Sequence, residues 1–210
     1  MNKQIIKHNI VKTLSVKRMG SFDLMNNGQL FDQKIIDKLK IKISKKLELS
    51  GPENVSVMSS GSLSLWLALK ILSPNKLDLP YYCCPSIKNA CRVADIYTDL
   101  YDCDFGSVNV DFKKNSNKNS KVLVHNFGFL SSELNVNASQ FINDFTHLFC
   151  SQSVKNKFHS STLFGFASAY ATKPFTMGGQ GGIVWSRDAN FISEIESALN
   201  HTDPKKVFLN

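Results

Sequence analysis

Short apolar runs alternate with helical patterns along most of the chain, and this alternation restricts the fold more than any other feature. Apolar residues recur at three- and four-residue spacing among lysines from Phe31 to Leu47, which predicts an amphipathic helix ending near Ser50-Gly51-Pro52. Beyond it, we expect strands at residues 55–58, 77–80, 97–103, 122–124, 140–143, 161–167 and 182–186, helices at 63–72, 85–96 and 190–199, and a polar loop at 113–121. Strands that alternate with helices predict an α/β fold.

Length and composition fit one globular domain. The chain has 210 residues, of which 42% are hydrophobic. We expect an N-terminal arm and amphipathic helix in residues 1–50 and a single α/β domain in residues 51–210. The longest apolar run, residues 63–72, is interrupted by Ser64 and Lys70, and the N-terminus lacks a signal-peptide core. We therefore predict a soluble, cytoplasmic protein with no membrane partner.

Positive charge is spread along the chain. The net charge is +8, but the lysines lie mainly in the predicted amphipathic helix and in the polar loop, without an RNA-binding or zinc-finger signature. This pattern predicts no nucleic-acid partner, and an anionic substrate or an acidic partner fits the charge as well.

The cysteines do not indicate a disulfide framework or a metal site. Their number is odd, and no C-x-x-C or paired Cys/His spacing occurs. The five cysteines are Cys83, Cys84, Cys91, Cys103 and Cys150. We expect them to be reduced and mostly packed.

One lysine is followed by four glycines in the stretch S-A-Y-A-T-K-P-F-T-M-G-G-Q-G-G, residues 168–182. Glycine permits positive φ and a close approach of the backbone to a ligand, and a lysine beside such a turn can condense with an aldehyde as a Schiff base. Lys173 is therefore a candidate catalytic residue. A glycine-rich hairpin with a solvated lysine is the alternative.

The sequence S-S-G-S stands between a predicted strand and the apolar helix at residues 63–72. Unpaired N–H groups at a helix N-terminus attract anions, so Ser60-Gly61-Ser62 is a candidate phosphate cradle. Alternatively, Ser60 or Ser62 only caps the helix. Asp144 is expected at the carboxyl end of a strand, the edge where ligands gather in open α/β sheets.

In this order the motifs resemble the DegT/DnrJ/StrS family of sugar aminotransferases, pyridoxal-phosphate (PLP) enzymes of the aspartate-aminotransferase fold. The resemblance spans residues 59 to about 199, and H-N-F-G at residues 125–128 is similar to the family's H-[LN]-[YF]-G. It implies a three-layer sandwich around a mostly parallel sheet, the large domain of a fold type I PLP transferase. Ser60-Gly61-Ser62 then matches the turn that holds the cofactor phosphate, and Lys173 matches the lysine that binds PLP covalently.

Four further residues take roles from the resemblance. Asp144 matches the aspartate that pairs with the pyridinium nitrogen, and His147 matches the Gln/His position beside the ring. Ser168 matches a second phosphate-binding serine. Cys84 stands where the family usually has an aromatic ring that stacks on the cofactor, with Tyr82 nearby. Alternatively, Asp144 forms a strand-end turn, His147 is a packed core residue and Ser168 is an ordinary strand residue.

The resemblance implies transfer of an amino group from an amino-acid donor to a keto acceptor. A carboxylate at the ring nitrogen makes the ring an electron sink, and a released lysine is placed as a general base. The acceptor expected is a nucleotide-linked keto sugar in cell-surface polysaccharide or natural-product biosynthesis. A sugar dehydratase is a variant, and a non-catalytic PLP-binding subunit of a split enzyme is the alternative.

Full-length members of the family continue into a smaller C-terminal domain, which the sequence up to Asn210 does not include. The resemblance therefore predicts a truncated large domain whose site is completed by a second copy or by another chain. We expect a homo-oligomer or a hetero-oligomer.

Overall fold

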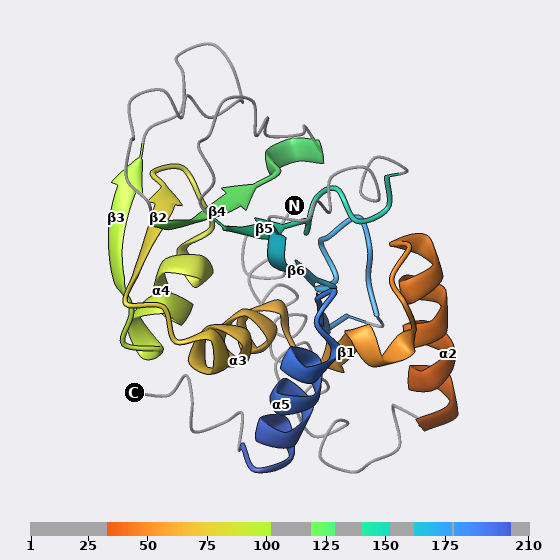
Figure 1. The fold of residues 1–210 in the computed structure, drawn as a ribbon. Coiled ribbons are helices and arrows are strands. Elements are labelled where there is room, and N and C mark those ends of the chain that lie inside the picture. Colours follow the sequence, from red (N-terminus) through yellow and green to blue (C-terminus); the bar gives the residue numbers. More distant parts are fainter. Residues whose placement is uncertain (1–32, 102–118, 129–139, 152–161, 178, 203–210) are drawn as a thin grey trace, which may run out of the picture. The chain divides into compact units, whose positions relative to one another are not determined.

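The computed structural model describes residues 33–101, 119–128, 140–151, 162–177 and 179–202. The helices are α2 (Gln33–Lys46), α3 (Gly61–Leu72), α4 (Pro85–Val93) and α5 (Ala189–Asn200), and the strands are β1 (Val55–Met58), β2 (Lys76–Pro80), β3 (Tyr97–Tyr101), β4 (Ser120–Val124), β5 (Phe141–Asp144), β6 (Thr162–Ser168) and β7 (Gly182–Trp185) (Figure 1). The chain divides into two compact units, residues 1–39 and 40–210. In the first unit the structure describes only residues 33–39, the start of α2.

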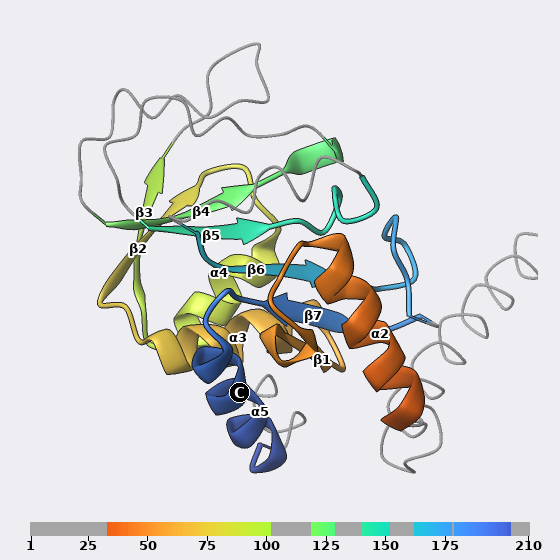
Figure 2. The same ribbon diagram turned by 45° about the vertical axis from the view of Figure 1, so that its right-hand side comes forward.

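The strands form one seven-stranded sheet in the order β1-β7-β6-β5-β4-β2-β3. Strands β2 to β6 are mutually parallel, whereas β7 runs antiparallel to both β6 and β1. Figure 2 shows β4, β5 and β6 pointing one way and β7 the other. The predicted α/β class with a mostly parallel sheet is confirmed.

This topology collects several predicted site residues at one edge. Asp144 ends β5 and Ser168 ends β6, and Ser168 pairs with Gly182 at the start of β7. Strand β1 finishes opposite the same glycine, so α3 also begins at this edge. The carboxyl edge of the sheet is therefore where a site is expected in an open α/β fold.

The helices α3, α4 and α5 cover one face of the sheet (Figure 1). Helix α3 contacts β6 and β7 as well as α4 and α5, so apolar side chains all round it are buried. Alternate strand residues such as Leu77, Val122 and Ile142 complete this core. Residues 102–118, 129–139 and 152–161, which belong to the connections between β3 and β6, fall outside the described residues, as does much of the predicted N-terminal arm. The domain boundary after residue 50 stays a prediction.

Some predicted boundaries were wrong. The helix predicted at residues 85–96 ends at Val93, because Asp95 has a left-handed backbone (φ 60°) and turns the chain into β3. The strand predicted at residues 140–143 is shifted by one residue to 141–144, and Asp144 lies at its carboxyl end as expected. Cys103, at the end of a predicted strand, lies outside the described residues.

The polar loop predicted at residues 113–121 was also wrong at its end, where Ser120 and Lys121 belong to β4. Lys121 and its partner Asp78 on β2 are both fully buried. Their Nζ and Oδ2 atoms are 2.6 Å apart, and Asn119 donates to the other Asp78 oxygen at 3.0 Å. A lysine can occupy this position because a carboxylate from the adjacent strand compensates its charge.

In the part of the chain that the structure describes, no helix combines the length and the apolar character needed to span a membrane.

We expect Lys121→Met to lower the free energy of unfolding by about 3–5 kcal/mol, because it leaves the Asp78 carboxylate buried without its cation. The double variant Asp78→Leu/Lys121→Met is expected to regain most of this loss. Urea unfolding of the three proteins measures both effects.

Lys70→Met is the matched control, since Lys70 pairs with Asp95 at the surface, where the aspartate side chain is 85% exposed. It is expected to cost less than about 1 kcal/mol. Equal losses for the two single variants would contradict the structural role of the buried pair.

Candidate functional site

Lys173 lies in the connection between β6 and β7 and is half-buried. Its Nζ is 3.3 Å from Nε2 of His147, a residue in the turn that follows β5. The backbone N–H of Lys173 donates to the carbonyl of Tyr170 at 2.9 Å, which turns the chain toward this histidine. The connection is a glycine-containing hairpin, as the alternative interpretation held, but its lysine contacts an imidazole.

Asp144 is buried at the end of β5, with the residue 7% exposed. One carboxylate oxygen accepts from the N–H of Thr146 at 2.9 Å. Burial raises the pKa of the Asp144 carboxyl above its ordinary value of 3.8, while the hydrogen bonds of Thr146 and the charges of His147 and Lys173 act in the opposite direction. Asp144, His147 and Lys173 thus form one electrostatically connected group.

Ser60 is the N-cap of α3. Its side-chain oxygen accepts from the N–H of Leu63 at 3.1 Å, so the capping role considered for this serine is present. Gly61, the first residue of the helix, packs so tightly on the end of β6 that an added Cβ would lie 2.7 Å from Cβ of Ser168. The Ser60 turn and Ser168 are therefore direct neighbours. Ser62, in the first turn of α3, is half-buried.

Glycines hold the connection that carries Lys173 against the turn at Ser60. Gly181 bridges to Ser60 and has a φ of 147°, which disfavours a side chain. A Cβ on Gly182 would overlap the carbonyl group of Ser60. The predicted close approach of a glycine backbone thus occurs, and its neighbour is the start of α3.

Ser168 is joined to the Asp144 turn by the side chain between them. The N–H of Ser168 donates to Oγ1 of Thr146 at 3.0 Å, and the N–H of the same threonine donates to Asp144. Thr146 was not predicted. Its place between Asp144 and His147 was the only sequence signal.

Cys84 is exposed and occupies the N-cap position of α4 without a capping hydrogen bond from its side chain, and its Sγ is 3.1 Å from Oγ of Ser86. The ring centroid of the nearby residue Tyr82 is 6.3 Å from that of Phe127, and the Tyr82 carbonyl accepts from the Asn126 side chain at 3.4 Å. Phe127 in turn lies 6.3 Å, between ring centroids, from His147, and cofactor binding by Cys84 stays a prediction.

A buried polar chain supports β5 from the neighbouring strands. His125 contacts the Asn143 side chain at 3.1 Å, and Asn143 donates to Thr162 at 3.1 Å. The His125 ring stacks on Phe145 at a centroid distance of 4.7 Å. These contacts fix the backbone on both sides of Asp144.

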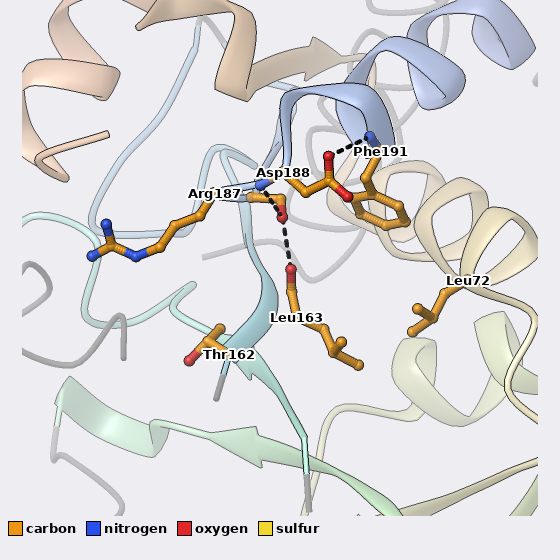
Figure 3. Close-up of a pocket in the computed structure, with 7 residues that line it drawn as sticks. Leu72, Thr162, Leu163, Arg187, Asp188 and Phe191 are labelled. Atoms are coloured by element: carbon orange, nitrogen blue, oxygen red, sulfur yellow. Dashed lines mark hydrogen bonds between the residues drawn. The ribbon is translucent and has the colours of Figure 1, made fainter. Parts of the chain in front are cut away.

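A separate hollow lies at the other end of β6 (Figure 3). Its wall includes Leu72, Leu163 and Phe191. The polar side chains beside it have structural partners. Ser186 Oγ donates to the Leu163 carbonyl of β6 at 2.8 Å, and Asp188 accepts from the N–H of Phe191 in the first turn of α5 at 3.3 Å. This hollow has a structural explanation and lies away from Lys173.

No group of three or more His, Cys, Asp or Glu side chains within the described ranges is arranged to hold a metal ion.

Models of known protein families do not match this sequence, and a search of curated proteins finds no relative. Solved structures do match. A DegT DnrJ EryC1 StrS aminotransferase from Brucella abortus has 15% identity and a TM-score of 0.62, with 93% of this chain and 57% of that chain covered. DesI, solved in the presence of its TDP-sugar product, has 14% identity and a TM-score of 0.66, with 89% and 50% covered.

A third match is Spr1654 from Streptococcus pneumoniae, named as a sugar aminotransferase and solved in its PLP form, with 14% identity, a TM-score of 0.64 and coverage of 87% and 54%. The chain thus spans about half the length of these structures. At these identities the matches establish the fold, which is that of the predicted PLP aminotransferases.

We expect Gly182→Ala to lower the free energy of unfolding by about 1–3 kcal/mol, because the new methyl group forces the Ser60 turn away from β7. Gly179→Ala is the comparison. A Cβ added at Gly179 would meet no atom within 4 Å, so this substitution costs only the backbone strain of a residue with a side chain at φ 109°. Urea unfolding measures both, and a smaller loss for Gly182→Ala would contradict the tight contact.

The raised pKa of Asp144 predicts a pH-dependent stability. The folded protein holds the proton more tightly than the unfolded chain, so this contribution is fully present below about pH 3.8 and is lost as the pH rises through the folded-state pKa. We expect the free energy of unfolding of the cofactor-free wild type, relative to Asp144→Asn, to fall with rising pH. Urea unfolding from pH 4 to 8 measures this difference, and an increase with pH would refute the assignment.

Proposed function

We propose that this chain is a PLP-dependent aminotransferase of the DegT/DnrJ/StrS family. The observation that carries the proposal is the convergence of Lys173, His147 and Asp144 at the sheet edge where α3 begins. A lysine, an imidazole and a buried carboxylate beside a helix N-terminus are the groups that hold PLP and assist its chemistry. The fold shared with solved aminotransferases supports the same conclusion.

The start of α3 fits the phosphate of PLP. Its N-terminal N–H groups and helix dipole favour an anion. Ser168 is brought against Gly61, so its hydroxyl is placed to assist the same anion. Ser60 already caps the helix through its side chain, and Ser62 is in the first turn. We therefore assign phosphate binding to Ser60, Gly61, Ser62 and Ser168.

The buried carboxylate fits the cationic ring nitrogen of PLP. A cation beside Asp144 offsets the desolvation that raises its pKa, and Thr146 orients the carboxylate through its N–H. When bound, PLP supplies an aldehyde for amine exchange and a ring that stabilises negative charge at the substrate α-carbon. Asp144 is assigned to keep that ring protonated.

Lys173 is assigned two tasks. Its amine would hold the cofactor covalently, and the same amine would move a proton at the substrate α-carbon. His147, 3.3 Å away, orients the amine. Tyr82 and Phe127 are assigned to the aromatic side of the site, and Cys84, which stands where the family usually has a stacking ring, is assigned to the cofactor as well.

We further propose an amino-acid donor and a nucleotide-linked keto sugar as acceptor, supported by the TDP-sugar product in the DesI structure. The proposed enzyme is a cytoplasmic oligomer, in which a second copy or another chain contributes to the site. A PLP-binding subunit without activity of its own is the second candidate, since the chain spans about half the length of the solved aminotransferases.

The test is absorption spectroscopy of the purified chain with added PLP. We expect a visible band that is lost in Lys173→Ala, because the band requires covalent attachment through this amine. Lys88→Ala is the matched control, since Lys88 is an exposed lysine whose Nζ lies over the Tyr81 ring. A band that persists in Lys173→Ala would rule out the assigned lysine.

Catalysis is tested separately by adding each common amino acid and measuring conversion of bound PLP to pyridoxamine phosphate by chromatography. Conversion by wild type, and its loss by orders of magnitude in Asp144→Ala, supports the aminotransferase. A Lys173-dependent band without conversion in any amino acid would favour the non-catalytic subunit.

A further inference from the structure

Phe127 has a backbone conformation that is rare for an aromatic residue. Its φ and ψ are 55° and 19°, in the left-handed region that is disfavoured for bulky residues with a Cβ. The residue is 66% exposed, so burial of its ring does not compensate for this conformation. Non-glycine residues held in such strained conformations are concentrated at functional sites.

The turn around Phe127 packs on His147. The backbone N–H of Phe127 donates to Nδ1 of His147 at an N–N distance of 3.2 Å. The two rings are 6.3 Å apart with an interplanar angle of 27°. Gly128 continues the turn with a φ of 82°, and a Cβ there would lie 3.7 Å from the His147 carbonyl oxygen. The strained residue thus directs its N–H at one ring nitrogen.

This contact fixes which imidazole nitrogen carries the proton. A neutral imidazole has one nitrogen with a lone pair and one N–H group. Nδ1 uses its lone pair to accept from Phe127, so the proton is on Nε2. Nε2 is the atom 3.3 Å from Nζ of Lys173. The N–H of His147 therefore faces Nζ of Lys173.

We propose that Phe127 is a positioning residue, whose left-handed backbone holds His147 as the Nε2–H tautomer and so directs the N–H of its ring at Nζ of Lys173. An amine that accepts a hydrogen bond from such an N–H is in the form that attacks an aldehyde. The use of this amine for PLP rests on the proposed function, but the tautomer does not.

Asp144 is the charged group that competes with this arrangement. Its carboxylate acts on both His147 and Lys173, and a negative charge favours an imidazolium. A protonated Nδ1 would place its N–H against the N–H of Phe127. The tautomer of His147 therefore reports which of the two neighbours, Phe127 or Asp144, controls the ring.

The experiment is ¹⁵N NMR of the cofactor-free chain labelled in its five histidines, at neutral pH. The ¹⁵N shifts and their couplings to the ring protons distinguish the two neutral tautomers from the imidazolium. The signals of His147 are identified by their loss in His147→Gln. We expect the Nε2–H tautomer in the wild type, and an Nδ1–H tautomer or an imidazolium would overturn the proposal.

Two variants without the aromatic ring separate the backbone from the side chain. Phe127→Asn tolerates the left-handed conformation and is expected to keep the Nε2–H tautomer. Phe127→Val disfavours it and is expected to give a mixture of tautomers. We also expect Lys173 to react with added PLP about three- to tenfold more slowly in the valine variant than in the asparagine variant, as for the loss of one hydrogen bond.

An unchanged Nε2–H spectrum in Phe127→Val would overturn the role of the backbone. If this variant does not fold, the wild-type spectrum still decides the tautomer, and a loss of the tautomer in Phe127→Asn would likewise refute the proposal. The NMR measurement requires no PLP. If the spectra are as expected but the chain does not bind PLP, the proposed function is rejected and the inference about the tautomer still holds.

Discussion

The contact between Gly182 and the carbonyl of Ser60 is the constraint on which the site depends. Gly182 begins β7, and Ser60 begins α3. Because no Cβ fits between them, the two backbones lie against each other, and the pairing of Gly182 with Ser168 brings the end of β6 to the same point. One small residue thus holds together a helix start, a strand end and the base of the lysine connection.

The direction of β7 explains why Lys173 belongs to this group. An antiparallel strand returns at the edge where β6 ends, so the connection that carries Lys173 stays at the carboxyl edge of the sheet. A parallel strand would need a crossover to the opposite edge. The single reversal of direction beside β6 therefore places a nucleophilic amine next to a carboxylate delivered by the parallel strand β5.

The order of the elements, and the place of Asp144 and the Ser60 turn at one edge, could be predicted because they rest on local patterns and on a general property of α/β sheets. The meeting of Lys173 with Asp144 was implied by the resemblance. The burial of Lys121 could not be predicted, because lysine is usually exposed and its partner Asp78 is 43 residues away in the sequence. The contact of Phe127 with His147 also had no local signal. An aromatic residue type does not indicate a left-handed backbone, and the donor is a main-chain N–H, which every residue except proline carries.

Two features of the site lower the stability of the ligand-free protein, the buried carboxyl of Asp144 and the left-handed backbone of Phe127. Both costs are tied to positions that the fold fixes from outside the site, through β5 and the turn after β4. In the proposed enzyme a bound cationic ring would compensate the first, because it supplies the charge partner that burial denies Asp144. Cofactor binding would then stabilise the folded chain as well as equip it for chemistry, since a ligand that binds only the native state shifts the unfolding equilibrium toward it.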